Sequence, residues 1–244
     1  MDLNADSGEA IGDDAAMMAV VTSASVACGY HAGDADTMRA TVAAAAAHEV
    51  AVGAHVSYAD RARFGRVFID LPPSQLHRAV LDQFAALVAV AAESGAEVRY
   101  CKPHGALYNA IVHHEQQADA VAAALAEVLP ELPVLCLPHS AIERAATARG
   151  LRPVIEAFAD RAYAPDGTLV PRSRPGSVLT DAAAIAARVV RLATDGVLEA
   201  VDGSPVRIPA ESICVHGDTP GAVAIARAVR VALQAAGVEL APFA

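Results

Sequence analysis

The chain has 244 residues, of which 55% are hydrophobic, and it carries a formal net charge of −10. Its length suits one large β/α domain, and no linker rich in Ser, Gly or Pro divides it, so we expect residues 1–244 to fold as a single domain. The acidic balance argues against nucleic acid and membrane surfaces as partners, since both call for basic patches. The first residues are acidic and do not resemble a secretory signal, and no apolar run is long enough to span a bilayer. We therefore expect a soluble, cytoplasmic protein.

Short apolar runs predict parallel strands, and the alanine-rich stretches between them predict helices, because a parallel strand is buried and its crossover is usually helical. The runs that predict strands are 2–4, 25–31, 50–54, 97–101, 134–137, 154–157 and 212–215. The expected helices cover 14–22, 34–48, 74–93, 115–129, 140–149 and 177–195, and a last one begins at 219. Seven strands separated by helices predict an α/β fold, a TIM-like barrel smaller than the eight-fold form, with an open doubly wound sheet as the alternative.

Local signals support several of these elements. Asp34 and Ser74 are suited to cap helices, and Thr219 followed by a proline marks the start of the last helix. The Asp202-Gly203 pair predicts a small hairpin. Residues 56–72 form a long connection without a pattern of its own, and a loop of this length tends to be functional.

Five of the apolar runs end at or near a histidine. These histidines are His31, His55, His104, His139 and His216. Parallel strands present their C-terminal ends at one edge, where β/α folds build active sites, so the pattern predicts one common site. We interpret His139 as a structural residue, because it leads straight into a helix.

Carboxylates and a lysine are expected at the same edge. Asp6 and Glu9 directly follow the first predicted strand, where a general base or a metal ligand is common, although Glu9 could instead cap the next helix. Lys102 lies beside a Pro-His-Gly turn, where its ammonium could meet a phosphate. Residues 216–222 bring a helix N-terminus directly to a strand end, which suits an anion.

Arginines crowd the polar loop 160–176, where interleaved prolines indicate an ordered segment. We expect Arg161, Arg172 and Arg174 to favour a carboxylate or a phosphate there. The sequence has no standard phosphate-binding loop and no Gly-x-Gly-x-x-Gly. It also has no nucleophile elbow of the Ser-His-Asp hydrolases. Any use of ATP would therefore have to rely on other groups.

Six motifs, taken together and in order, cover nearly the whole chain. They are Asp2-Leu3-Asn4-x-Asp6-x-Gly8-Glu9, residues 27–34, residues 53–55, Lys102-Pro103-His104-Gly105-Ala106-Leu107-Tyr108-Asn109, residues 158–172 and residues 215–222. This set resembles the LamB/YcsF family. The resemblance implies a β/α barrel akin to the glycoside hydrolase/deacetylase superfamily. It also implies ATP-dependent opening of 5-oxo-L-proline to L-glutamate, with this chain as the A subunit of a complex with the 5-oxoprolinase subunits B and C.

The resemblance also suggests roles for the polar residues. Those expected to be catalytic are Asp6, His55, Lys102, His104 and Asp218. Those expected to bind substrate or phosphate are Glu9, His31, Asn109, Asp160, Arg161, Tyr163, Arg172 and His216. ATP with Mg²⁺ is the expected cofactor, because phosphoryl transfer usually needs a cation at the phosphates.

Two other functions remain open at this point. A metal-dependent amide hydrolase, similar to deacetylases of this barrel type, would hold a divalent ion with Asp6, His55 and His104. Alternatively, the chain could be a non-catalytic subunit that binds the substrate while its partners perform the chemistry.

Overall fold

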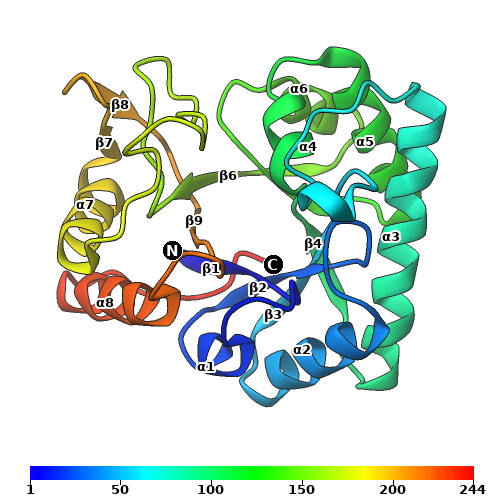
Figure 1. The fold of residues 1–244 in the computed structure, drawn as a ribbon, viewed down its shortest axis with the longest axis horizontal. Helices are drawn as coiled ribbons and strands as arrows, with labels where there is room; N and C mark the ends of the chain where they lie inside the picture. The colour runs from blue at the N-terminus through cyan, green and yellow to red at the C-terminus, as the bar shows by residue number, and fades with distance from the viewer.

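The computed structural model describes residues 1–244, and its centre is a closed barrel of parallel strands in the order β1-β2-β3-β4-β5-β6-β9 (Figure 1). The strands are β1 Asp2–Ser7, β2 Ser23–Ala27, β3 Ala51–His55, β4 Val98–Cys101, β5 Pro133–Cys136, β6 Arg152–Phe158 and β9 Ser212–Val215. Pairing of β9 with both β1 and β6 closes the ring. The predicted seven-stranded barrel is confirmed, and the open sheet is wrong.

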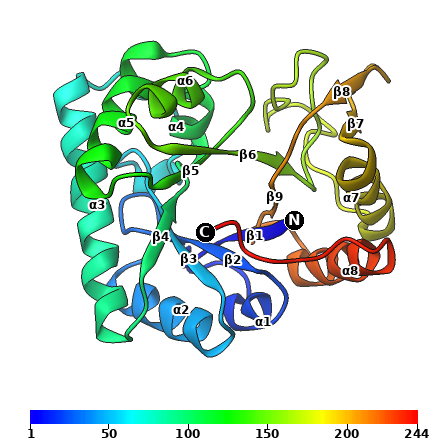
Figure 2. The same ribbon diagram turned by 180° about the vertical axis from the view of Figure 1, so that it is seen from behind.

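Helices surround the barrel, as the two opposite views show (Figures 1 and 2). They are α1 Asp14–Met18, α2 Ala35–Ala47, α3 Pro73–Glu93, α4 Gly105–Ala110, α5 Glu115–Val128, α6 Ala141–Ala148, α7 Ala182–Asp195 and α8 Ala222–Ala235. A short 3-10 turn, Arg61–Arg63, lies in the loop after β3. The expected hairpin is formed by β7 Val197–Glu199 and β8 Pro205–Arg207. None of the helices combines the length and the apolar character that a membrane-spanning segment requires.

Several boundaries differ from the sequence-based expectation. The last helix starts at Ala222 rather than at Thr219. The Thr219 hydroxyl donates to the Asp160 carboxylate and does not cap the helix. The helix expected from 177 starts at Ala182, because the Asp181 side chain caps it. Pro72, not Ser74, precedes α3, and α4 occupies a segment that was expected to be a loop. Asp34 caps α2 as predicted.

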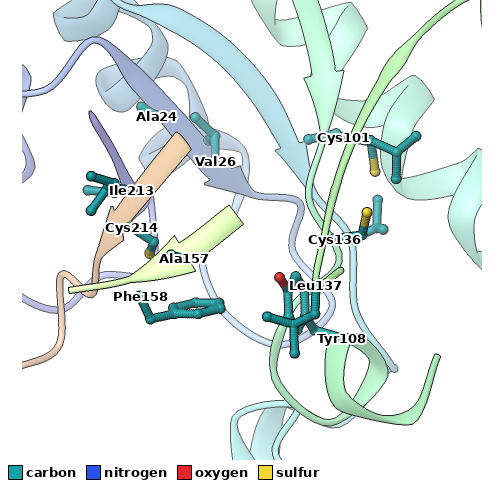
Figure 3. Packing of buried hydrophobic residues seen from close by; sticks show 14 of the residues in the cluster. Ala24, Val26, Cys101, Tyr108, Cys136, Leu137, Ala157, Phe158, Ile213 and Cys214 are labelled. Carbon is teal, nitrogen blue, oxygen red and sulfur yellow. The ribbon is translucent and has the colours of Figure 1, made fainter. Parts of the chain in front are cut away.

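Alternation along the strands decides which side chains enter the barrel, because successive residues of a strand point to opposite faces. In β1, Leu3 and Ala5 belong to the apolar core between sheet and helices. Asp2, Asn4 and Asp6 alternate with them and contact polar side chains of other segments inside the barrel. Figure 3 shows part of the apolar layer, including Ala24 and Val26 of β2.

Buried polar side chains therefore form a connected column inside the barrel. The members of this polar column are Asp2, Ser212, Asn4, Glu156, Lys102 and Asp6. The Ser212 hydroxyl donates to Asp2, and the Asn4 amide donates to Ser212 at 2.7 Å and to Glu156 at 2.8 Å. Lys102 continues the column with contacts of 2.8 Å to Glu156 and 2.9 Å to Asp6. The column ends at the C-terminal edge of the strands.

The C-terminal tail covers the opposite end of the barrel, where β1 begins. The Ala241 N–H donates to the Met1 carbonyl, and the Phe243 ring lies 5.0 Å from the Tyr100 ring, centroid to centroid. Tyr100 itself fits inside because Gly53 has no side chain: a Cβ at that position would come within 2.2 Å of the ring.

Candidate functional site

A cavity of about 600 Å³ opens at the C-terminal ends of the strands. The residues that matter most in its lining are Asp6, His55, Lys102, His104, Arg172 and His216. They come from β1, β3, the segment after β4, the loop after β6, and the residue after β9. The structure thus brings most of the predicted residues to one place. Asp6 lies within β1 rather than after it, because this strand extends to Ser7.

Three of the predicted histidines meet Glu9 in one compact group, which we call the imidazole cluster. Its members are Glu9, His31, His55 and His104. Glu9 Oε1 lies 3.2 Å from His31 Nε2, 3.5 Å from His104 Nδ1 and 3.9 Å from His55 Nε2. His104 Nδ1 lies 2.9 Å from His55 Nε2, and the His31 and His104 rings stack with centroids 3.8 Å apart. The interpretation of Glu9 as a helix cap is wrong, because Asp13 caps α1.

The loop after β3 holds the cluster in place. His104 Nε2 lies 2.9 Å from the Phe64 carbonyl, and His55 Nδ1 lies 2.9 Å from the Lys102 carbonyl. Gly65 packs so closely that a Cβ there would lie 2.9 Å from His31 Cβ and 3.0 Å from His104 Cδ2. The long loop was expected to be functional, and it supplies these contacts.

Burial sets the protonation preferences of the cluster. Burial and the neighbouring imidazoles hold the pKa values of His31 and His104 well below the ordinary histidine value. Burial also raises the pKa of Glu9 well above its usual range, and the charges of Asp6 and Asp218 add to this effect. Both shifts favour the neutral forms of these groups.

Beside the cluster, Lys102 forms a buried ion pair with Asp6 and Glu156. Its ammonium also contacts Asn4 Oδ1 at 3.2 Å and Cys214 Sγ at 3.0 Å. Burial opposes the charged ammonium, but Asp6, Cys214 and Glu156 outweigh it and raise the pKa of Lys102 well above its ordinary value. Burial likewise opposes the Asp6 carboxylate, while His55 and Lys102 bring its pKa well below the usual value.

His216 and Asp160 form a second pair at the cavity. His216 Nδ1 lies 2.8 Å from Asp160 Oδ1, and the Thr219 hydroxyl donates to Asp160 Oδ2 at 2.6 Å. Although burial opposes the Asp160 carboxylate, these partners and their charges lower its pKa. The His216 ring stacks on Phe158 with centroids 5.2 Å apart, and Figure 3 shows Phe158 facing Tyr108 across the barrel end. Asp160 is fully buried and lies behind His216 rather than in the cavity lining.

Two arginines and one carboxylate form the arginine rim of the cavity: Arg66, Arg172 and Asp218. Arg66 donates to Asp218 Oδ2, and Arg172 lies 3.7 Å from Asp218 Oδ1. Asp218 was expected to be catalytic, and the structure places it between these two cations. Asn109 also lines the cavity, and its amide donates to the Gly105 carbonyl at 2.9 Å.

Two predicted binding residues have other partners. The Arg161 guanidinium touches the cavity but donates to the carbonyls of Ser177 and Val170, so it ties the loop after β6 together. Burial and the nearby Arg172 lower the pKa of Arg161 to about 10. Tyr163 is fully buried, and its hydroxyl accepts the Phe158 N–H at 2.8 Å. Both side chains thus have partners within the chain, and their expected role in substrate binding stays a prediction.

Three residues of the site were missed. Glu156 interrupts an apolar strand run with a carboxylate, which is a signal that sequence reasoning could have used. Arg66 lies in the long loop after β3, whose function was expected although this residue was not selected. Cys214 was interpreted only as a buried thiol, and its contact with Lys102 depends on the closed barrel. His139, in contrast, lies outside the site: its φ is 60°, and its N–H donates to Glu143.

Comparison with known proteins extends over the full chain. The profile of the LamB/YcsF family matches residues 1–244. A protein of Kocuria rhizophila, named as the A subunit of 5-oxoprolinase, is 58% identical, with 100% of this chain and 99% of that protein covered. A protein of the same name from Corynebacterium jeikeium is 53% identical, with 100% and 96% covered.

Solved structures agree with the fold. The lactam utilization protein of Thermus thermophilus superposes with a TM-score of 0.94 at 42% identity, covering 100% of this chain and 99% of that one. A family 4 carbohydrate esterase from Streptomyces lividans covers 100% of this chain and 92% of its own, with a TM-score of 0.53 at 12% identity. The esterase therefore shows only that the barrel type is shared.

Proposed function

Because this chain belongs to the LamB/YcsF family, we propose that it is the A subunit of a 5-oxoprolinase. In this proposal it acts with subunits B and C, and together they convert 5-oxo-L-proline, ATP and two waters to L-glutamate, ADP and phosphate. Full-length relatives that carry the name of this 5-oxoprolinase component support the proposal. The structural observation that carries it is the cavity in which an imidazole backed by a carboxylate faces the arginine rim.

The chemistry explains why such a cavity is needed. A five-membered lactam is a poor electrophile, and phosphorylation of its amide oxygen by ATP would turn that oxygen into a leaving group. A first water could then attack the carbon if a base accepts its proton, and the C–N bond would break with the protonated nitrogen leaving as the amine. The acyl phosphate formed in this way would be hydrolysed by a second water to the γ-carboxylate of glutamate and phosphate. The phosphates and the substrate carboxylate require cations that are fixed before they arrive.

We assign the base role to His216. Its Nδ1–H donates to Asp160, so the lone pair of Nε2 remains available on the cavity side. Asp160 is held in turn by Thr219, and this support fixes the ring and its tautomer. Asp160 is thus a positioning residue, whereas the sequence pattern indicated a binding residue.

The cations divide into two kinds. Arg66 and Arg172 lie at the cavity rim and are the groups proposed to meet the substrate carboxylate or the phosphates of Mg²⁺-ATP. Lys102 is only 1% exposed and already has four partners, so it orients Asp6 instead of binding phosphate directly. Asp6, His55 and His104 then form the floor beneath the reacting carbon.

The test is reconstitution of the full chain with subunits B and C, assayed for glutamate release from 5-oxoproline with and without ATP. Glutamate should appear only with ATP. His216→Asn should lower kcat by about 100-fold or more, the usual contribution of a general base. His139→Asn is the matched control, because His139 also follows a strand but lies outside the cavity, and it should keep full activity. Activity of His216→Asn within about threefold of wild type would contradict the assignment of the base.

Two alternatives give different results in the same assay. A metal-dependent amide hydrolase, which the imidazole cluster favours, would release product without ATP and lose activity with a chelator. A non-catalytic binding subunit would bind 5-oxoproline, and His216→Asn would then weaken binding without any change in kcat of the complex.

A further inference from the structure

Three guanidinium groups line the cavity together, and we call them the arginine group: Arg66, Arg161 and Arg172. Arg66 comes from the loop after β3, and the other two come from the loop after β6. Burial, the charge of Arg172 and the charge of Arg66 all oppose the charged form of Arg161 and lower its pKa, so the three cations are near enough to repel one another. The contacts of each guanidinium decide whether this arrangement is structural or a binding site.

Arg161 is fixed by the chain and still has a donor left over. Its side chain is only 4% exposed. Its Nε donates to the Ser177 carbonyl at 3.2 Å, and its Nη2 donates to the Val170 carbonyl at 2.7 Å. The third nitrogen, Nη1, makes no bond within the chain and is not enclosed by it. Because this side chain lines the cavity, Nη1 is free to donate to a ligand there.

Arg66 and Arg172 share a single carboxylate, that of Asp218. Arg66 donates to Asp218 Oδ2, whereas Arg172 Nη2 lies 3.7 Å from Asp218 Oδ1. A separation of 3.7 Å is too long for a hydrogen bond, so the donors of Arg172 are left without a close acceptor at Asp218.

A second carboxylate, Asp160, lies near Arg161 but is already occupied. Its two oxygens accept from His216 and Thr219. The arginine group therefore carries more positive charge than the free carboxylates around it can balance. Burial opposes the Asp160 carboxylate, but His216, Thr219 and Arg172 together lower its pKa. A ligand of the arginine group would thus lie beside His216, the assigned base.

We propose that the arginine group binds a phosphoryl group, and that Asp218 occupies part of this site in the free chain and is displaced by the ligand. The inference deepens the proposed function and rests on it for the source of the phosphoryl group. It assigns the arginine group to phosphate and not to the substrate carboxylate.

The number of donors favours a phosphoryl group over a carboxylate. A phosphate monoester presents three strong acceptor oxygens and carries about −1.5 to −2 charge near neutral pH. A carboxylate presents two oxygens and one charge, and the fork of a single guanidinium can pair with both of them. Three guanidiniums exceed what a carboxylate can satisfy. Burial and Arg172 lower the pKa of Arg161 to about 10, so this group is still charged at pH 7, and a bound anion would offset the repulsion.

Asp218 is suited to the part of a displaceable counter-ion. Its side chain is 14% exposed, and no side chain other than the two arginines pairs with it. It lies in the turn between β9 and α8, where Gly221 has a φ of 78° and no side chain caps the helix. An anion with more charge and more oxygens can therefore take its place between Arg66 and Arg172 without disturbing the buried core.

The test measures binding of inorganic phosphate to the full chain alone by isothermal titration calorimetry at pH 7. We expect one equivalent to bind, and we expect saturating 5-oxoproline to leave the affinity for phosphate unchanged. Competition by Mg²⁺-ATP would identify the terminal phosphate of ATP as the group that is bound, whereas simultaneous binding would identify the released phosphate. Absence of phosphate binding by the chain, folded by circular dichroism, would overturn the proposal. Displacement of phosphate by 5-oxoproline would also overturn it, since the site would then belong to the carboxylate.

Variants locate the site and test the displacement. Asp218→Asn should tighten phosphate binding by about fivefold or more, because it removes a competing charge and its repulsion of the ligand. Arg161→Lys keeps the charge but cannot hold two carbonyls and a ligand at once. This variant and Arg172→Met should each weaken binding by about 10-fold or more, the effect of one lost hydrogen bond to a charged group. Arg174→Met is the matched control, since Arg174 lies in the same loop but does not line the cavity, and it should bind as wild type does.

The outcomes separate this proposal from the proposed function. Unchanged or weaker binding by Asp218→Asn would refute the displacement, and unchanged binding by both Arg161→Lys and Arg172→Met would refute the site. Phosphate binding by the chain alone requires neither turnover nor subunits B and C. A failed glutamate assay with intact phosphate binding would therefore count against the proposed function and not against the site.

Discussion

Replacing Lys102 by methionine removes the one positive charge of the polar column. Lys102 is 1% exposed and touches two carboxylates, Asp6 at 2.9 Å and Glu156 at 2.8 Å. Methionine fills much of the same volume but leaves both carboxylates without their counter-ion. Breaking a buried pair in this way costs about 3–5 kcal/mol, because the remaining charge is buried and uncompensated.

This loss should be measurable without destroying the fold. A change of about 1 kcal/mol moves the midpoint of a 150–250-residue protein by roughly 2–4 °C, so Lys102→Met should melt about 10 °C lower. Native domains are stable by about 5–15 kcal/mol, so the variant should remain folded at 25 °C. Activity of the reconstituted complex should be lost, since Asp6 is no longer oriented.

A second substitution separates the charge effect from packing. Glu156→Gln, added to Lys102→Met, removes one of the two uncompensated charges and should recover at least about 1 kcal/mol, within the range seen for contacting pairs. Urea unfolding of the wild type, both single variants and the double variant at pH 7 gives the coupling energy. If Lys102→Met unfolds within about 1 kcal/mol of wild type, or if Glu156→Gln does not change its stability, the reasoning about the column is refuted.

Two further predictions concern Asp2, at the end of the barrel where β1 begins, and Gly53 in the wall of the barrel. Burial raises the pKa of Asp2 above its ordinary value of 3.8, despite hydrogen bonds from Ser212, Ser23 and Thr22. Above pH 3.8 the folded state therefore keeps a proton on Asp2 that the unfolded state releases. The contribution of Asp2 to the free energy of unfolding consequently falls as the pH rises above 3.8. Asp2→Asn should therefore reduce the decline of stability over that range in urea unfolding; a steeper decline would contradict the sign. Gly53→Ala should cost about 3 kcal/mol or more, because its Cβ would lie 2.2–2.5 Å from three atoms of the Tyr100 ring. Addition of Tyr100→Leu should restore much of that loss, and equal stability of Gly53→Ala and wild type in thermal unfolding would disprove the contact.

The strands could be predicted from the sequence because each is a short apolar run followed by polar side chains. The positions of His55, Lys102, His104 and His216 at the strand ends followed from that pattern alone. The strand pattern favoured a barrel but left an open sheet as the alternative, because closure depends on β9 pairing with both β1 and β6, strands that are far apart in the chain.

The orientation of individual side chains was harder to predict. The alternation of Asp2, Asn4 and Asp6 with apolar residues indicates a strand with a polar inner face, yet Asp6 was placed in a loop. Arg161 and Tyr163 belong to a polar loop, and nothing local shows that their polar atoms turn mainly to backbone groups. Such contacts are set by how the loop after β6 folds back on itself.

The Phe243 ring packs on Tyr100 and covers the end of the barrel where β1 begins, so this end is closed to small molecules. Met1 and Ala241 are hydrogen-bonded to each other at that sealed base. Small molecules must consequently enter and leave by the face that carries the arginine rim. Immobilisation on a sensor through either terminus would leave that face turned towards the solution.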